Sequence, residues 1–375
     1  MKDNKVFFLI VNVDWFFLSH RLPLAMAMKN RDYEVYILTK DTGRKKEIKA
    51  NGLKFIEVDF ERSGKNPWKE LLIIQKLIRL FKKFQPKIIH NVTIKPAIYS
   101  SIALKFYKKK DVKFINAISG LGYNFTRERN GIMQKVIKSM MRFAYKGNIY
   151  FIFQNPDDME LYRNMGFIVN NNFRIIKGAG VDTSVFRYNE PLQKSKIEIV
   201  FVARMLLDKG IRELIEAAKI LRNTWESKAC FKLIGDVDEA NLSSLKKADL
   251  DKIVIPGYIE WLGYTTDIQP SLIMSDIACL PSYREGLPKS LIEAMAIGRP
   301  IVTTDVPGCR ECVDDKVNGF LVPVHDGKAL AKALETLMLD PELRIEMGKA
   351  SRQKVISEMS LQQVIAETFQ FYEQI

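Results

Sequence analysis

The sequence has few cysteines and no long apolar runs. Its 375 residues include four Cys, too few for the disulfide framework of a small secreted domain, so a reducing compartment is favoured. The longest apolar runs, such as Val6 to Val11, are far shorter than the roughly 18 residues that span a bilayer. With 20 Gly and 14 Pro, the chain lacks the bias of fibrous or low-complexity sequences. No repeat of about 20 to 50 residues indicates a solenoid.

What is present is the composition of an ordinary folded protein. Hydrophobic residues make up 47% of the chain and charged residues 27%, which is enough apolar material for a large core. At about 150 residues per domain, this length predicts two domains. Lys2 and Lys5 precede the apolar run, but Asp3 and Asp14 do not fit a signal peptide, so we expect a cytoplasmic protein.

Positive charge is concentrated in the first half of the chain. Residues 1–185 contain 34 Lys and Arg against 16 Asp and Glu, whereas residues 186–375 contain 24 against 28, and the net charge is +14. Such a field attracts polyanions or an anionic membrane surface. The segment from Trp68 to Lys83 is amphipathic with a cationic face, and further cations lie at Lys105, Lys108 to Lys110, Lys113, Arg127, Arg129, Lys135 and Lys138. This favours peripheral contact with the inner face of the cytoplasmic membrane. A core-packing helix with solvated lysines is the alternative.

Short apolar runs alternate with amphipathic segments along the whole chain. Several runs are apolar on both faces, which is typical of a parallel sheet covered by helices. We expect strands at 6–11, 34–39, 54–59, 87–92, 112–118, 149–154, 173–177, 197–204, 229–235, 253–258, 277–281, 300–304 and 319–323. The pattern predicts an α/β protein with two doubly wound Rossmann-like domains, residues 1–185 and 186–375, facing a central cleft. The final helix, about 356–375, is expected to pack back on the first domain.

The segment from Pro281 to Pro300 carries the clearest site pattern. It begins where an apolar strand ends, turns through Gly286 and Pro288, and continues into a helix. Because the first amides of a helix have no acceptor within the helix, the amides around Gly286, Leu287 and Lys289 predict a phosphate-binding helix start.

Glu285 and Glu293 lie eight positions apart in this segment. A carboxylate accepts hydrogen bonds only, so two of them facing one pocket suit the hydroxyls of a sugar or a ribose. In the alternative interpretation, Glu293 is an exposed helical residue that pairs with Lys289.

Two cations follow another predicted strand. Arg204 ends the strand, and Lys209 precedes Gly210 and the next helix. An Arg fork and a Lys point charge at such a turn can bind a diphosphate, although a single basic residue at a turn is usually solvated. Together with the loop after Ser282, they favour a nucleotide diphosphate ligand.

Four segments, in this combination, resemble the retaining GT-B glycosyltransferases of family 4. They are Arg204-x4-Lys209, Glu285-x7-Glu293, Gly178-Ala-Gly-Val-Asp182, and Pro307-Gly-Cys-Arg-Glu311 with the later Asn318 to Pro323. The likeness covers essentially the whole chain. It implies an acceptor-binding first domain and a second domain that binds the nucleotide sugar.

The resemblance also implies roles for individual residues. Glu285 would contact donor sugar hydroxyls, Glu293 would hold the ribose, and Arg204 with Lys209 would neutralise the leaving diphosphate. Glu285, Arg204 and Lys209 are thus the expected catalytic residues, and the expected donor-binding residues are Glu293, Gly286, Leu287, Pro288, Lys289 and Gly180. No metal or other cofactor is expected, because the cations and helix amides supply the electrostatic stabilisation.

The first half departs from the family pattern. The turn from Asn12 to His20 replaces a Gly pair of many relatives, and Ser119 stands where many have a His. The candidate acceptor-side residues are His20, His90, Asn91, Ser119 and Gly120, although a lone His is more often structural. The Ser119 to Tyr123 and Pro307 to Glu311 segments look like a bacterial branch that builds capsule, O-antigen or glycan precursors on polyprenyl diphosphate. The glycines in the first segment could instead only permit a tight turn.

The resulting expectation is a metal-independent, retaining transfer of a hexose or N-acetylhexosamine, from a UDP-sugar to a polyprenyl-diphosphate-linked saccharide. The alternatives are a nucleotide-sugar epimerase of the same fold and a non-catalytic nucleotide-sugar-binding protein. A nucleic-acid binder is disfavoured because the chain has no compact basic and aromatic module. Zinc is disfavoured because Cys309-x2-Cys312 has no second pair. The sequence does not identify the base, the sugar, the acceptor or the linkage.

Overall fold

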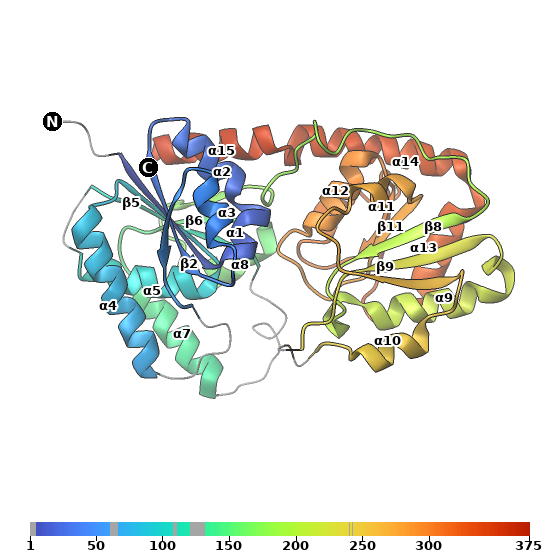
Figure 1. Ribbon diagram of the computed structural model, residues 1–375, viewed down its shortest axis with the longest axis horizontal. Coiled ribbons are helices and arrows are strands. Elements are labelled where there is room, and N and C mark those ends of the chain that lie inside the picture. Colours follow the sequence, from blue (N-terminus) through green and yellow to red (C-terminus); the bar gives the residue numbers. More distant parts are fainter. Residues whose placement is uncertain (1–4, 61–66, 108–110, 121–131, 240, 242) are drawn as a thin grey trace. The chain divides into compact units, whose positions relative to one another are not determined.

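The computed structural model describes residues 5–60, 67–107, 111–120, 132–239, 241 and 243–375 (Figure 1). The chain divides into two compact units, one formed by Met1–Ala179 with Ile365–Ile375 and the other by Gly180–Val364. Each unit contains a parallel sheet with helices, which confirms the predicted class of two doubly wound α/β domains. No helix that the structure describes has both the length and the apolar character needed to cross a membrane.

The first unit is built on a seven-stranded sheet in the order β3-β2-β1-β4-β5-β6-β7. Every recorded pairing is parallel. β1 and β4 lie at its centre and are buried almost throughout, as expected for strands that meet helices on both faces. The strands are β1 (Val6–Val13), β2 (Glu34–Lys40), β3 (Lys54–Glu57), β4 (Ile88–Val92), β5 (Lys113–Ile118), β6 (Tyr150–Phe153) and β7 (Phe173–Ile175).

Helices cover both faces of this sheet. One core joins side chains of the sheet to Leu77, Tyr99, Met141 and Tyr162, which come from four different helices. On the other face, Tyr372 of the last helix lies against β1 and β4. The helices of this unit are α1 (Asp14–His20), α2 (Leu22–Lys29), α3 (Lys45–Ala50), α4 (Pro67–Phe84), α5 (Ile94–Lys105), α7 (Ile132–Ala144), α8 (Pro156–Asn164) and most of α15 (Leu361–Gln374).

The second unit is built on a six-stranded parallel sheet in the order β10-β9-β8-β11-β12-β13. The order reverses between β8 and β11, which are neighbours in the sheet although six elements, including β9 and β10, separate them in sequence. In open α/β sheets, ligands bind beyond the carboxyl ends of the strands at such a switch point. The strands are β8 (Ile197–Val202), β9 (Ala229–Ile234), β10 (Ile259–Gly263), β11 (Ile277–Leu280), β12 (Ile301–Thr304) and β13 (Gly319–Val322).

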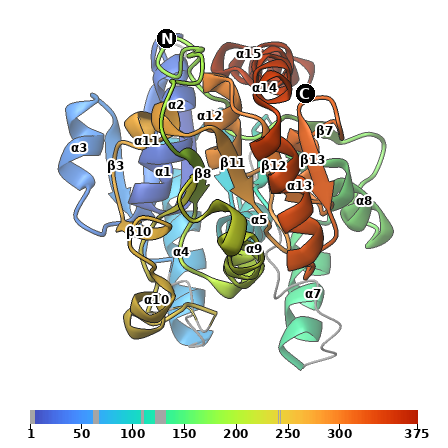
Figure 2. The same cartoon turned by 90° about the vertical axis from the view of Figure 1, so that its right-hand side faces the viewer.

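Helices also flank the second sheet, with α9 packed against α13 and α12 packed against α11 and α14 (Figure 2). Their apolar sides and the strands form one continuous core. The helices are α9 (Ile211–Trp225), α10 (Lys247–Ile253), α11 (Gln269–Met274), α12 (Lys289–Ile297), α13 (Gly327–Leu339) and α14 (Pro341–Lys354). Shorter helical turns are η1 (Leu207–Lys209), η2 (Arg310–Cys312) and η3 (Val355–Met359).

One predicted strand is wrong. Residues 253–258 do not form a strand, because α10 ends at Ile253 and the chain then turns through Pro256 and Gly257. Gly257 has a left-handed φ of 75°, and the amides of Ile255 and Ile259 donate to each other's carbonyl oxygens. The apolar run is therefore a tight turn, and the strand β10 begins only at Ile259.

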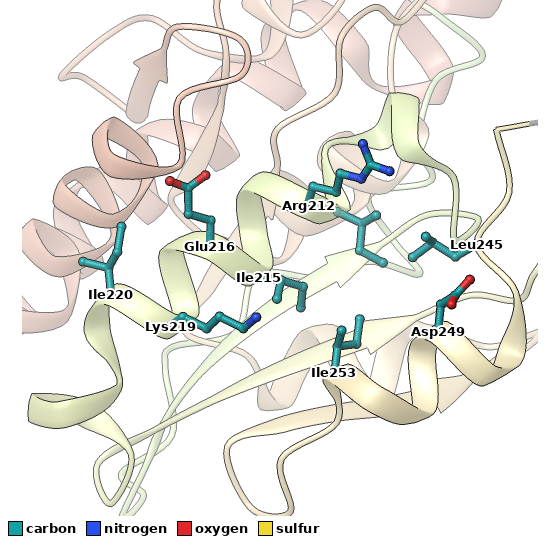
Figure 3. A pocket seen from close by; sticks show the side chains of 9 residues that line it. Arg212, Ile215, Glu216, Lys219, Ile220, Leu245, Asp249 and Ile253 are labelled. Atoms are coloured by element: carbon teal, nitrogen blue, oxygen red, sulfur yellow. The ribbon is translucent and has the colours of Figure 1, made fainter.

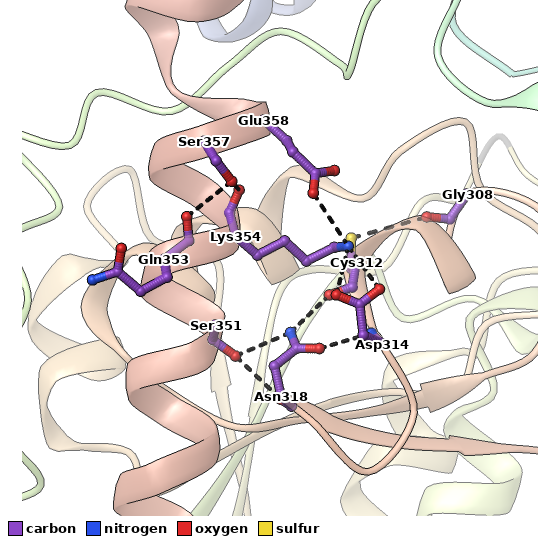
Figure 4. Close-up of polar contacts among 9 residues, drawn as sticks. All are labelled: Gly308, Cys312, Asp314, Asn318, Ser351, Gln353, Lys354, Ser357 and Glu358. Atoms are coloured by element: carbon purple, nitrogen blue, oxygen red, sulfur yellow. Dashed lines mark hydrogen bonds and ion pairs between the residues drawn. The ribbon is translucent and has the colours of Figure 1, made fainter.

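The Asn318 to Pro323 segment has a structural role (Figure 4). Asn318 is buried, and its side chain donates to the carbonyl oxygen of Cys312 (2.9 Å) and to Ser351 Oγ (3.2 Å). It also accepts from the Asp314 amide at 2.7 Å. Gly319 follows at a point where a Cβ would lie 2.0 Å from the Ile301 carbonyl oxygen, so only glycine fits. These contacts fix the start of β13 against α14.

Candidate functional site

Two loops meet at the switch point of the second sheet. One leads from β8 through η1 to α9, and the other leads from β11 to α12. The Tyr283 amide and the Ser282 hydroxyl both donate to the Asp208 carbonyl oxygen, at 2.9 and 3.0 Å. A Cβ on Gly210 would lie 1.9 Å from the Pro281 carbonyl oxygen. The two loops therefore pack backbone against backbone, which requires the glycine.

This packing brings two of the predicted residues together. Lys209 forms an ion pair with Glu285, and only 17% and 15% of these side chains are exposed. Salt screens a partly buried pair of this kind less than it screens an exposed ion pair. The structure thus places a cation and a carboxylate, predicted from two separate motifs, within contact of each other.

A third loop, which follows β12, packs against the backbone of Glu285. The Glu285 amide donates to the Pro307 carbonyl oxygen at 3.1 Å. Gly308 has a φ of 80°, and a Cβ there would lie 2.4 Å from the Glu285 carbonyl oxygen and 2.6 Å from that of Gly286. The Pro307-Gly308 dipeptide after β12 therefore sets the position of the Glu285 backbone.

Glu293 lies in α12 and is buried, with 6% of the residue exposed. It pairs with Lys289 at 3.2 Å. The alternative interpretation of Glu293 is thus right about the pair and wrong about exposure. Burial raises the pKa of this carboxyl, and the Lys289 charge opposes the shift only in part. Pro288 is the N-cap of the helix, and Gly286 and Leu287 precede it.

Arg204 pairs with Asp238, a residue that the sequence analysis missed. Asp238 ends an Asp-x-Asp triplet, Asp236 to Asp238, which is separated from β9 by Gly235 alone. That triplet at a strand end was the signal that could have found it. The partner of Arg204 depends on how the loops after β8 and β9 pack together, which the sequence alone does not specify.

A second missed group surrounds Tyr283. Its hydroxyl lies 2.8 and 3.0 Å from the two carboxylate oxygens of Glu213, and His325 Nδ1 lies 3.3 Å from one of them. The Tyr283 and His325 rings are 4.1 Å apart between centroids. This group anchors the loop before Glu285 to α9. No sequence motif links these three positions.

Gly180 packs against the start of the last helix. A Cβ on this residue would lie 2.8 Å from the Leu361 Cα, and Val181 forms a bridge with Ser360. The glycine is therefore required by this close approach of two backbone segments. Contact between Gly180 and a donor stays a prediction.

In the first unit, His90 and Asn91 lie inside β4, and both are buried. His90 Nδ1 is 2.6 Å from the Tyr372 hydroxyl, and burial together with the Arg21 charge lowers the pKa of this imidazole to about 3. Asn91 donates to Asn116 Oδ1 at 2.9 Å. Contact of either side chain with an acceptor would require a rearrangement of the sheet.

The other acceptor-side candidates lie outside the strands. His20 ends α1, where its ring stacks on Phe16 at 4.2 Å and its Nδ1 is 2.6 Å from Ser19 Oγ. Ser119 and Gly120 follow β5 and are half-buried. The rest of the predicted segment, from Leu121 to Tyr123, lies outside the described residues, as do Lys108 to Lys110, Arg127 and Arg129.

The four cysteines are free thiols and buried. Burial, and secondly the Glu285 charge, raises the pKa of Cys309 to about 12, so this thiol stays protonated at neutral pH. Among the described residues, no three His, Cys, Asp or Glu side chains are grouped to hold a metal ion.

A hollow of about 570 Å³ lies between α9 and α10 (Figure 3). Its wall contains Ile211, Ile215, Ile220, Leu245 and Ile253, with charged side chains at the rim. None of the predicted site residues lines it. The hollow is a separate feature of the second unit.

Comparisons with known proteins identify similar glycosyltransferases. A family model described as "Glycosyl transferases group 1" matches residues 182–354, and one described as "Glycosyl transferase 4-like" matches residues 5–155. The chain is 29% identical to the N,N'-diacetylbacillosaminyl-diphospho-undecaprenol alpha-1,3-N-acetylgalactosaminyltransferase of Campylobacter jejuni, over 91% of this chain and 93% of that protein. It is 25% identical to the UDP-Gal:alpha-D-GlcNAc-diphosphoundecaprenol alpha-1,3-galactosyltransferase of Escherichia coli, over 88% and 86%.

Solved structures share the fold. A glycosyltransferase from Rickettsia africae matches with a TM-score of 0.77 and 21% identity, over 99% of this chain and 98% of that chain. An Anabaena protein solved in complex with UDP matches with a TM-score of 0.77 and 15% identity, over 99% and 100%. The two family models together cover most of both units, and the chain therefore belongs to the family 4 glycosyltransferases of the GT-B fold.

Proposed function

We propose that the protein transfers a hexose or N-acetylhexosamine from a UDP-sugar to a saccharide linked to polyprenyl diphosphate, with retention of the anomeric configuration. The names of two relatives, which act on diphospho-undecaprenol acceptors, support the acceptor class. The contact between Lys209 and Glu285 at the switch point carries the proposal for the donor. There, a cation for the diphosphate adjoins a carboxylate for the sugar hydroxyls.

In the proposed reaction, the bond between the sugar C1 and the diphosphate oxygen breaks, and the diphosphate leaves with the electron pair. The acceptor oxygen forms the new bond to C1 on the same face, and its proton passes to the departing phosphate oxygen. Arg204, Lys209 and the amides before α12 would stabilise the negative charge that develops there. In the proposed mechanism no metal ion takes part, because these groups supply the required positive charge.

Glu285→Gln tests the role of this carboxylate. The amide can no longer accept two strong hydrogen bonds from sugar hydroxyls, so kcat should fall about 100- to 1,000-fold. Glu346→Gln is the control, since Glu346 is exposed on α14 of the same unit. Product formation on a synthetic polyprenyl-diphosphate saccharide would be followed by mass spectrometry. Undiminished turnover of the Glu285 variant would contradict the assigned role.

Two further measurements separate the alternatives. Incubation with the UDP-sugar alone should leave its configuration unchanged, because an epimerase needs no acceptor. Binding of UDP without turnover on any lipid-linked saccharide would favour the non-catalytic binding protein. Thermal stabilisation by UDP-, GDP- and ADP-sugars would identify the base, since a ligand held by the folded state raises the melting temperature.

We also propose that the basic first unit contacts an anionic membrane surface, where such an acceptor would reside. Its support is the start of α4, where Trp68 and Leu72 are 76% and 63% exposed beside exposed Lys69 and Lys76. Exposed aromatic and basic side chains together favour an interfacial position. Co-sedimentation with vesicles containing anionic lipid should exceed that with neutral vesicles, and Trp68→Ser should reduce it. Equal sedimentation with both vesicles would contradict this part of the proposal.

A further inference from the structure

The three predicted donor-site cations are each paired with a carboxylate. Lys209 pairs with Glu285, Lys289 with Glu293 and Arg204 with Asp238. Three positive and three negative charges therefore cancel at a site proposed to receive a strongly anionic diphosphate. Two of these carboxylates have proposed contacts with the donor, whereas Asp238 has none, so its presence needs another explanation.

Asp238 is held in place by its loop. Its amide donates to Ser244 Oγ at 2.9 Å. The same loop is joined to the residues after Arg204, because Met205 donates to the Asp236 carbonyl oxygen at 3.0 Å and Leu245 donates to that of Met205 at 2.9 Å. The Asp238 side chain is 18% exposed, against 40% for Arg204. The carboxylate is thus fixed and partly desolvated, while the guanidinium is open to solvent on another side.

We propose that Asp238 is a built-in competitor of the donor diphosphate for Arg204. This inference rests on the proposed function, in which Arg204 binds the diphosphate. A guanidinium binds a carboxylate or a phosphate through the same planar fork, so a diphosphate has to displace Asp238. Binding of the donor is thereby weakened, and after transfer the returning carboxylate speeds the release of UDP.

Asp238→Asn tests the competition, because it keeps the shape and removes the charge. The Kd for UDP and the KM for the UDP-sugar should both fall about three- to tenfold, the range expected for loss of a partly buried carboxylate competitor. The dissociation rate of UDP should fall by a similar factor. A side chain with a merely structural role would not produce tighter binding when it is changed.

Two control variants accompany this test. Glu239→Gln removes the same charge from the neighbouring, exposed position and should leave the Kd for UDP within about twofold of the parent. Asp238→Glu keeps the charge and should also bind UDP like the parent. Thermal melting confirms that each variant folds, and UDP titration calorimetry gives the Kd.

Several results would overturn the inference. Unchanged or weaker UDP binding by Asp238→Asn would show that the carboxylate does not compete. An equal increase in UDP affinity in Glu239→Gln would show that the effect comes from the overall charge of the loop and not from Asp238. If Mn²⁺ enhances parent activity, EDTA abolishes it, and Asp238→Asn loses that response, Asp238 is instead a metal ligand. If the parent itself binds no UDP at millimolar concentration, the proposed function fails together with this inference. If the parent binds UDP and Asp238→Asn does not bind it more tightly, only this inference fails.

Discussion

Replacement of Gly308 by Ala should disturb the Glu285 loop more than it disturbs the fold. Gly308 has a left-handed φ of 80°, and an added Cβ would lie 2.4 Å from the Glu285 carbonyl oxygen. An ordinary contact begins near about 3.4 Å, so the Glu285 backbone has to move by about 1 Å. The left-handed conformation itself costs an alanine about 1–2 kcal/mol, and the overpacking adds about 1–3 kcal/mol.

Gly166→Ala is a matched control. Gly166 has a φ of 77°, but a Cβ there would meet nothing within 4 Å. This variant should lose only the conformational part, about 1–2 kcal/mol of the free energy of unfolding, whereas Gly308→Ala should lose about 2–5 kcal/mol in total. Urea denaturation of both variants measures the difference.

Activity is the second measurement for the same pair. A displacement of about 1 Å at a positioning group can reduce the rate about 100-fold, so Gly308→Ala should lose most of its kcat well below its melting temperature. Gly166→Ala should keep the parent kcat. If both variants have the same unfolding free energy and the same kcat, the inference that Gly308 positions Glu285 is wrong.

Three further predictions concern the buried polar groups. His90 is neutral in the folded protein, because burial and the Arg21 charge lower its pKa to about 3, whereas in the unfolded chain it titrates near 6.5. The unfolded chain therefore binds more protons, and the free energy of unfolding decreases as the pH falls below 6.5. Between pH 7 and 5, urea denaturation should show that the parent loses about 2 kcal/mol more of this free energy than His90→Gln. The same pH dependence in both proteins would contradict this prediction. Asn318→Ala leaves the Asp314 amide and the Cys312 carbonyl without their partner and should lower the free energy of unfolding by about 2–4 kcal/mol, against less than about 0.5 kcal/mol for exposed Asn223→Ala. Because burial raises the pKa of Glu293, UDP affinity should weaken as the pH falls through that raised pKa, and calorimetry should find no such dependence in Glu293→Gln.

Much of the fold could be predicted because buried parallel strands have a distinctive apolar signature. The runs at Val6 and Ile277 begin real strands because neither face of a central strand meets water. The run at Ile253 begins with similar apolar residues but continues with Pro256 and Gly257. Gly257 has a left-handed conformation, and the chain forms a tight turn there. The apolar composition of this run therefore predicted a strand wrongly, because the left-handed conformation of Gly257 produces a turn there.

The part of the site that lies at the carboxyl ends of strands could be predicted from the sequence. Lys209 and Glu285 follow adjacent strands of the sheet, so their meeting follows from the topology. The partner of Arg204 and the anchoring of Tyr283 depend on loop conformation and on side chains distant in sequence. Such contacts are set by tertiary packing, which leaves no regular spacing in the sequence. His90 illustrates the converse case, since this candidate for acceptor contact is buried within the sheet.

The continuity of α15 has a consequence for biosynthesis. The first unit takes its last segment, Ile365–Ile375, from beyond the entire second unit. When residue 179 has left the ribosome, the surface of β1 and β4 that later contacts Tyr372 is still exposed to solvent. It stays exposed while 185 more residues, Gly180–Val364, are synthesised. The first unit therefore cannot complete its fold until the second unit has been synthesised. A chaperone that covers this apolar face during translation would help the protein more than one that acts after release from the ribosome.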